Sequence, residues 1–213
     1  MIGAGYTSTG TLIELELNDC YNALITNNVI HVSNYTASNG RAALEVGSGS
    51  IVKNNLFLGN GSNYDYAFDV VENSTISNNI FYGCSPNYRN RVGSFTRNST
   101  FKNNISFGSS ATDGNLFPEG NGNRLENNLV NINPQLENVP LSDDWSFEFD
   151  LSLQATSPAL AAGTDGKDIG PTGSSIPFDP TGVPLPLIQT FDTDEIVKKG
   201  DDLSISIKAR GKN

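Results

Sequence analysis

The stretch Ile76-Ser77-Asn78-Asn79-Ile80-Phe81 places two asparagines between short apolar segments. The same order of an apolar residue, a polar residue, two asparagines and an apolar residue occurs five times in the 213 residues. The other asparagine pairs are Asn27-Asn28, Asn54-Asn55, Asn103-Asn104 and Asn127-Asn128. Successive pairs lie 27, 24, 25 and 24 residues apart, while the sequence between them varies. A motif at a nearly constant period indicates a repeat architecture rather than low complexity.

A second apolar pattern lies upstream of the asparagines. Leu44 and Val46 precede the second pair, and Phe68 and Val70 precede the third, each with one residue between them. In a strand that intervening residue faces the opposite side. Each unit therefore predicts three short strands in about 24 residues, which is one turn of a β-solenoid. Such strands bury their apolar faces only if the turns, here called coils, stack.

The asparagine pair itself has a structural interpretation. Asparagine adopts the left-handed backbone conformation more readily than other non-glycine residues, so one member of each pair can make the bend between the second and third strands. Stacked coils then place Asn above Asn, and their amides can hydrogen-bond along the stack. We expect a structural asparagine ladder.

The repeat resembles the coil of right-handed parallel β-helix proteins of the pectate-lyase-like superfamily, of the secreted bacterial type. The resemblance covers roughly residues 10–135 and is carried by Ala43-Leu44-Glu45-Val46 followed by the segment Ile51 to Phe57. It implies an all-β, right-handed parallel β-helix of about five coils of 24–27 residues. That fold hosts lyases, hydrolases, epimerases, phage tailspikes and surface proteins, so the resemblance is specific for fold and weak for function.

The sequence divides into four parts. Residues 1–135 hold the coils, and residues 136–170 resemble the C-terminal cap of secreted β-helix proteins, expected to wrap the open end of the solenoid with Trp145, Phe147 and Phe149 as its plug. Residues 171–186 carry five of the ten prolines and predict a linker. Residues 187–213 are strand-like and resemble the start of an Ig-like domain. We expect a longer chain with further domains; the alternative is a complete protein with a frayed tail.

Composition excludes several classes of function. The net charge of −10 disfavours nucleic acid as a partner, since binding phosphates needs clustered Lys and Arg. No apolar run approaches the length of a membrane span. A single histidine, His31, excludes His-rich metal sites, and two distant cysteines form no zinc motif. The coil register places Cys20 and Cys84 on different sides of different coils, which disfavours a disulfide between them.

Candidate site residues come from the outward positions of the first strand in each coil. Alignment on the asparagine pairs places Glu45 and Asp69 there, with Glu16 expected in the first coil. Neighbouring coils lie about 4.7–4.9 Å apart, so these carboxylates should be close. Two close carboxylates can serve as the acid, base or nucleophile of glycoside hydrolysis. The same three residues are the candidate ligands of a Ca²⁺ ion.

The neighbouring loops add candidate substrate-binding residues: Arg41, Tyr64, Tyr66 and Tyr88. Aromatic rings stack on apolar sugar faces, and arginine binds carboxylate or sulfate groups with two hydrogen bonds. The resemblance to lyases of this fold further implies Arg89 or Arg91 as a base, with Ca²⁺ on Glu45 and Asp69. No catalytic motif of the family matches residue by residue. The competing interpretation is a solvated acidic face, with the tyrosines packed over coil edges.

Two hypotheses for function follow. The first is an extracellular carbohydrate-interacting module, secreted or at the cell surface, from a polysaccharide lyase or glycoside hydrolase. The second is a non-catalytic surface, adhesive or structural solenoid that acts as a spacer or fibre. The sequence leaves open whether the protein is an enzyme. A binder should bring the acidic, aromatic and arginine candidates to one groove, whereas a spacer should direct them into solvent.

Overall fold

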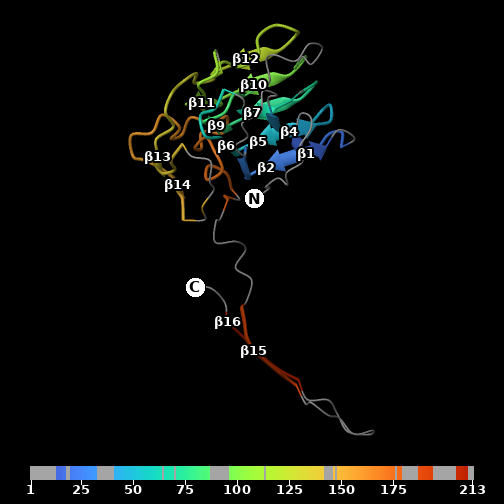
Figure 1. Ribbon diagram of the computed structural model, residues 1–213, viewed down its shortest axis with the longest axis vertical. Coiled ribbons are helices and arrows are strands. Elements are labelled where there is room, and N and C mark those ends of the chain that lie inside the picture. The colour runs from blue at the N-terminus through green and yellow to red at the C-terminus, as the bar shows by residue number, and fades with distance from the viewer. Residues whose placement is uncertain are drawn as a thin grey trace. The chain divides into compact units, whose positions relative to one another are not determined.

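The chain forms two compact units in the computed structural model, Met1–Phe178 and Asp179–Asn213. The structure describes residues 13–17, 20–32, 41–63, 65–69, 71–86, 96–112, 114–141, 146, 148–175, 177–178, 187–193 and 205–210. Strands but no helices occur among these residues (Figure 1). The second unit contributes β15 (Leu187–Thr193) and β16 (Ile205–Arg210), which pair antiparallel.

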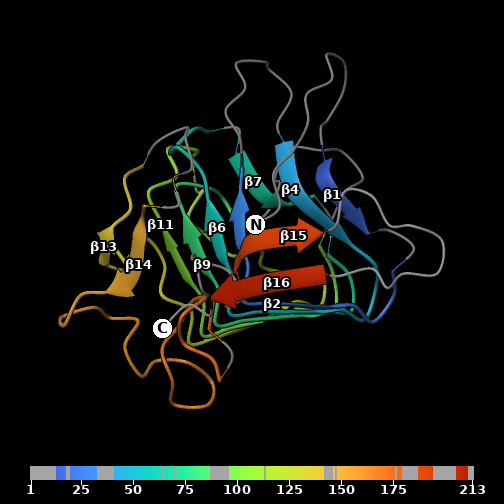
Figure 2. The ribbon, with the colours of Figure 1, turned by 90° about the horizontal axis from the view of Figure 1, so that it is seen from below.

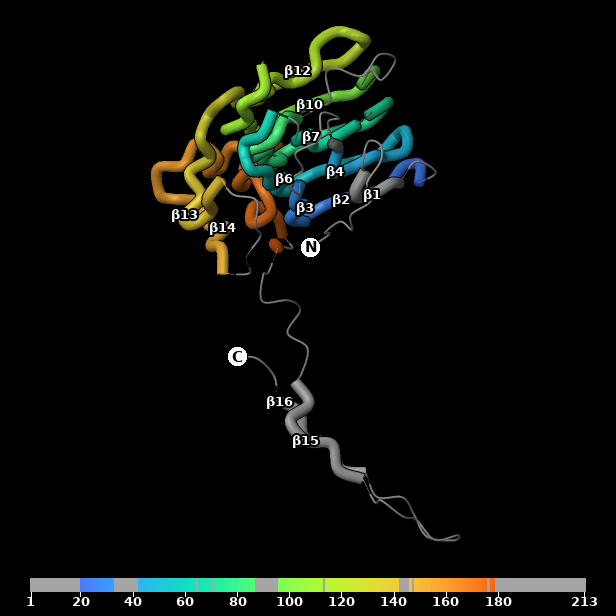
Figure 3. Tube along the Cα trace, viewed as in Figure 1, coloured from blue at the N-terminus to red at the C-terminus, as the bar shows by residue number. Residues whose placement is uncertain are grey.

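The first unit is a parallel β-solenoid with three sheets. The first sheet contains β1 (Ile13–Leu17), β4 (Arg41–Val46) and β7 (Asp65–Phe68). The middle sheet contains β2 (Leu24–Thr26), β5 (Ile51–Lys53), β8 (Thr75–Ser77), β10 (Thr100–Lys102) and β12 (Arg124–Glu126). The third sheet contains β3 (Val29–His31), β6 (Leu56–Leu58), β9 (Ile80–Tyr82) and β11 (Ile105–Phe107). Figure 3 follows the chain from coil to coil.

Every neighbouring pair of strands in these three sheets is parallel and offset by one repeat, which confirms the predicted β-solenoid. All five repeats supply a strand to the middle sheet. Within the described residues only the first three supply strands to all three sheets, so the complete coils number three. The fifth repeat joins the third sheet only through a bridge between Leu129 and Ile105.

The interior is filled mainly by apolar side chains that stack in rows from coil to coil. Phe57 and Phe81 lie with ring centroids 5.0 Å apart and nearly parallel, and Phe68 packs edge-on against Phe57 at 5.1 Å. All three rings are fully buried. Burial of each such ring contributes about 2 kcal/mol, so the stacked coils gain the stability that no single coil could have.

The asparagine ladder is present, and the two members of each pair differ. The first asparagine of every pair has a positive φ between 49° and 58°, which makes the predicted bend. The second asparagine points inward: the Nδ2 of Asn55 donates to the Oδ1 of Asn79 at 3.0 Å, and the Nδ2 of Asn79 donates to the Oδ1 of Asn104 at 3.1 Å. The backbone N–H of the same residues donates to the same oxygens, at 2.9 Å in each case.

A second ladder runs at the other end of the middle sheet and was not predicted. The backbone N–H of Ser50 donates to the Oγ of Ser74 at 3.0 Å, and that of Ser74 donates to the Oγ of Ser99 at 3.1 Å. Asn123 supplies the acceptor in the last coil. These residues lie four positions before the first asparagine of their pair, so the spacing was readable, but serine is too common to stand out by itself.

The C-terminal segment covers the side of the solenoid, which corrects the expectation that it wraps the open end. Here β13 (Leu136–Asn138) and β14 (Asp150–Leu153) lie beside β11 and β9 (Figure 2). Leu136, Leu151 and Ile169 form one buried cluster with outward residues of the third sheet. The reason lies in the continuous apolar runs of that sheet, such as Leu56-Phe57-Leu58, which need cover on both faces. Phe149 packs against this cluster, whereas Trp145 and Phe147 fall outside the described residues.

The first asparagines of the pairs hold this segment in place. Their side chains point outward, opposite to the ladder. Asn78 and Thr164 exchange two hydrogen bonds, in which the Nδ2 of Asn78 donates to the Thr164 Oγ1 at 3.0 Å and the Thr164 N–H donates to the Asn78 Oδ1 at 2.9 Å. The Nδ2 of Asn103 donates to the carbonyl of Ala162 at 2.7 Å, and that of Asn27 to the carbonyl of Pro171 at 3.1 Å.

Candidate functional site

Three acidic residues share one register position in successive strands of the first sheet and the turn that follows β7. Glu16 in β1 is the register partner of Glu45 in β4. The backbone N–H of Asp69 donates to the carbonyl of Leu44 at 3.3 Å, which places Asp69 beside Glu45 in the next coil. Because Leu44 and Phe68 face the interior, the alternating side chains of Glu45 and Asp69 face outward. The spacing between coils is about 4.8 Å, so neighbouring carboxylates can interact.

These acidic residues are more buried than a solvated face would require. Glu45 is partly buried, Asp69 is 4% exposed and Asp65, on the same side of β7, is 2% exposed. The backbone N–H of Asn60 donates to the Oδ2 of Asp65 at 3.3 Å. Charged groups are seldom buried without an interaction that compensates for lost hydration, so this face differs from an ordinary acidic surface.

The other predicted site residues divide into two groups. Tyr66 is 5% exposed and its hydroxyl donates to the carbonyl of Asn63 at 3.0 Å, so this ring packs within the protein and is not presented to a ligand. The backbone of Arg41 is the register partner of Asp65. Tyr64, Tyr88, Arg89 and Arg91 lie outside the described residues.

Both cysteines are free thiols. Cys84 is fully buried next to the first sheet, and its Sγ lies 3.6 Å from the carbonyl oxygen of Phe57. Burial raises the pKa of the Cys84 thiol well above its usual value, and the negative charge of Asp65 raises it further. Cys20 is exposed.

Within the part of the chain that the structure describes, no group of three or more His, Cys, Asp or Glu side chains is placed to hold a metal ion. The described residues also include no helix that is long and apolar enough to cross a membrane.

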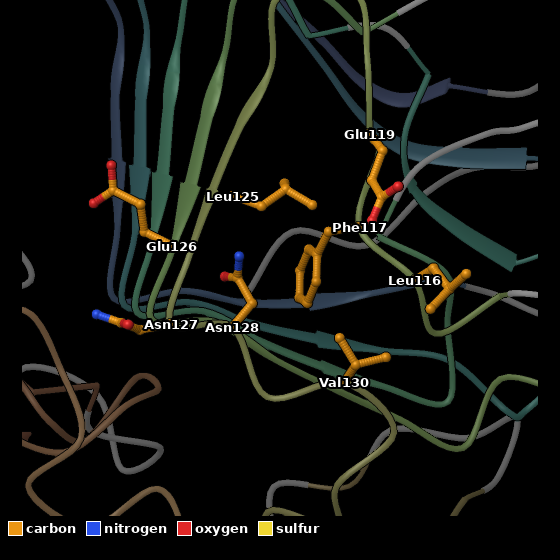
Figure 4. A pocket seen from close by; sticks show the side chains of 8 residues that line it. All are labelled: Leu116, Phe117, Glu119, Leu125, Glu126, Asn127, Asn128 and Val130. Carbon is orange, nitrogen blue, oxygen red and sulfur yellow. The ribbon is translucent and has the colours of Figure 1, made fainter.

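A second feature was not predicted from the sequence: a cavity of about 260 Å³ lies at the end of the solenoid (Figure 4). It is lined by the following residues of the fourth and fifth repeats: Leu116, Phe117, Glu119, Leu125, Glu126, Asn127, Asn128 and Val130. Leu116 and Leu125 are exposed at 41% and 37%, so the cavity opens on an apolar surface. The signal for it was indirect: no described coil follows the fifth repeat to cover its inner side.

Comparison with known proteins identifies no relative of the chain. A scan against family models, a search of curated proteins and a search of solved structures each return no significant match. The parallel β-solenoid therefore rests on the sequence repeat and the structure alone.

Proposed function

We propose that the chain is a carbohydrate-binding β-solenoid module that holds a neutral, hydroxyl-rich polysaccharide along the outward face of the first sheet. The observation that carries the proposal is the register of Glu16, Glu45 and Asp69 across successive coils, with the Glu45 side chain only partly buried. Carboxylates accept hydrogen bonds from hydroxyl groups, and a row at the strand spacing of about 4.8 Å offers a series of acceptors along one direction.

The charge of the protein favours a neutral polymer over an anionic one. At a net charge of −10 the chain repels polyanions over distances comparable to the Debye length. A uronic acid polymer would need a bridging cation such as Ca²⁺ between its carboxylates and those of Glu45 and Asp69. A module of this kind would act outside the cell, as a secreted or surface protein.

The test is a binding and turnover assay on a panel of neutral and uronic polysaccharides, each with Ca²⁺ and with EDTA. Affinity is measured by calorimetry, and turnover by new reducing ends and by ultraviolet absorbance of unsaturated products. We expect Glu45→Gln to weaken binding of a neutral polymer about tenfold or more, because it removes a hydrogen bond to a charged acceptor. Asp69→Asn should weaken binding less, because the Asp69 carboxylate is only 4% exposed.

The matched control is Glu137→Gln, which removes an exposed carboxylate on β13, away from the first sheet. It should leave affinity unchanged, and circular dichroism should show that all three variants are folded. If the chain bound uronic polymers alone, and only with Ca²⁺ present, the face would bind sugars through a cation and not directly. Turnover lost in Glu45→Gln would establish a lyase or hydrolase rather than a binder.

A second candidate, the non-catalytic structural solenoid, is favoured by the burial of Tyr66. That ring was expected to stack on sugar, and it instead packs within the protein. The asparagine ladder also continues without interruption from Asn28 to Asn128, which suits a rigid spacer. Absence of binding across the whole panel would favour this candidate.

A further inference from the structure

The two ends of the solenoid differ in how they are covered. At the inner position of the middle sheet, Val52, Ile76 and Phe101 are fully buried, and Ile25 in the first coil is only 8% exposed. The equivalent residue of the last coil, Leu125, is 37% exposed. The apolar interior is therefore closed at the first coil and open at the last one.

The open end is also an unpaired strand edge. The backbone N–H of Arg124 donates to Ser99 at 2.9 Å, and the carbonyl of Glu126 accepts from Asn103 at 2.9 Å, so both residues turn their backbone groups toward β10. The N–H and C=O of Leu125, between them, therefore point away from the sheet. Among the described strands β12 pairs only with β10, and it is the last strand of its sheet.

Earlier coils show what this edge normally binds. The carbonyls of Ile76 and Phe101, equivalent to that of Leu125, accept hydrogen bonds from the ladder asparagine of the following coil at 2.9 and 2.8 Å. No described coil follows Leu125. An open edge beside exposed apolar side chains is a site for pairing with another chain.

The apolar surface around this edge is contiguous. Leu116, Leu125 and Val130 are exposed at 41%, 37% and 39%, and all three line the same cavity (Figure 4). Phe117 closes its inner side: it is 2% exposed, and its ring centroid lies 5.8 Å from that of Phe81 and 6.0 Å from that of Phe101.

We propose that this end binds a second copy of the chain, with the two β12 strands antiparallel about a two-fold axis at Leu125. In such a pair Leu125 and the partner's Leu125 exchange both backbone hydrogen bonds. The inner side chains of both copies then lie on one side and join the two apolar interiors.

The charges on the outer side of β12 support the antiparallel arrangement. Arg124 and Glu126 flank Leu125 and form an ion pair within the chain. Antiparallel pairing about Leu125 puts Arg124 opposite the partner's Glu126, and Glu126 opposite the partner's Arg124. Each contact is attractive, and directly opposed pairs of this kind lie close together. A two-fold interface requires such self-complementarity.

Stacking of the open end on the first coil of another copy is disfavoured by the same burial data. The described inner residues of that coil, Ile25 and Ile30, are already 8% and 1% exposed, so they offer less apolar surface than Leu125 does at the last coil. Joining like end to like end therefore covers the exposed inner residues of both copies. A closed dimer is expected, not a filament.

The test is analytical ultracentrifugation of the full chain over a wide concentration range, with two single charge reversals. In a dimer of the Arg124→Glu variant, two pairs of glutamates face each other across the interface. In a dimer of the Glu126→Arg variant, two pairs of arginines do so. Each variant alone should dimerise about tenfold more weakly or not at all, because like charges face each other. An equimolar mixture of the two should recover dimers, since every opposed pair in the heterodimer is then attractive.

The mixture also excludes misfolding as the cause of a lost dimer, because misfolded chains would not recover on mixing. Lys53→Glu is the matched control: it reverses an exposed charge on β5, in the same sheet but away from its edge, and should dimerise as the wild type does. A wild-type chain that stays monomeric at all concentrations would overturn the proposal. So would single reversals that dimerise normally, or a mixture that fails to recover dimers.

Discussion

At the scale of the residue, adjacent asparagines have opposite roles in each coil. Asn79 is fully buried: it accepts from Asn55 and donates to Asn104 and to the carbonyl of Val52. Its removal would leave several buried polar groups unpaired, so Asn79→Ala should lower the free energy of unfolding by about 3 kcal/mol. Urea unfolding followed by circular dichroism measures this loss.

The neighbouring residue Asn78 provides the matched comparison. Asn78→Gly keeps the positive φ of 57° without strain and loses only the two hydrogen bonds to Thr164. We expect a loss of about 1 kcal/mol. Equal losses for the two variants would contradict the division between an inward ladder and an outward clamp.

A second prediction at this scale concerns the buried thiol. Because burial and Asp65 raise the pKa of Cys84, its reactive thiolate is scarce in the folded protein at pH 8, and the side chain is also inaccessible. A thiol reagent should modify one cysteine per folded chain, the exposed Cys20, and two per unfolded chain. The number of groups titrated before and after guanidinium addition measures this, and two fast-reacting thiols in the folded protein would be evidence against the buried position.

At the scale of the element, the sequence predicted what recurs and missed what occurs once. The bend at Asn78, the ladder at Asn79 and the parallel strands followed from five copies of one motif. Alignment of the repeats also predicted the shared register of Glu45 and Asp69. It did not reveal the burial of Tyr66 or of Asp69, because burial depends on neighbouring coils and loops that carry no repeat. The position of the cap was wrongly predicted for a related reason. The continuous apolar runs of the third sheet indicated that both of its faces are covered, and the prediction did not use this indication.

Close contact between coils gives the next prediction. Gly83 has a φ of +72°, and a Cβ at this position would lie 2.4 Å from the carbonyl oxygen of Gly59 and 2.8 Å from Leu141. Gly120 has a similar φ of +78°, but nothing lies within 4 Å of its Cβ position. Both alanine substitutions therefore share a backbone cost of about 1–2 kcal/mol. Gly83→Ala should cost several kcal/mol more, as measured by urea unfolding, and equal costs would show that the coils can move apart.

At the scale of the whole molecule, the first unit should be stable without the second. Among the residues whose side chains the structure describes, both buried clusters are formed by residues up to Phe178. The second unit contributes a two-stranded hairpin, and such hairpins are marginally stable by themselves. A chain that ends after Phe178 should therefore unfold within about 1 °C of the full chain in calorimetry.

A slightly shorter chain should behave differently, because the last residues of the first unit hold the cap. Ending the chain after Asp168 removes the buried Ile169, the bond from the Gly170 N–H to the carbonyl of Asn78, and the contact of Asn27 with Pro171. Together these should cost about 4 kcal/mol, which corresponds to a fall of roughly 10 °C in the midpoint for a unit of this size. If both truncated chains melted together, residues 169–178 would contribute little to the cap, which the residues up to Asp168 would then hold in place, including the contacts of Asn78 with Thr164 and of Asn103 with Ala162.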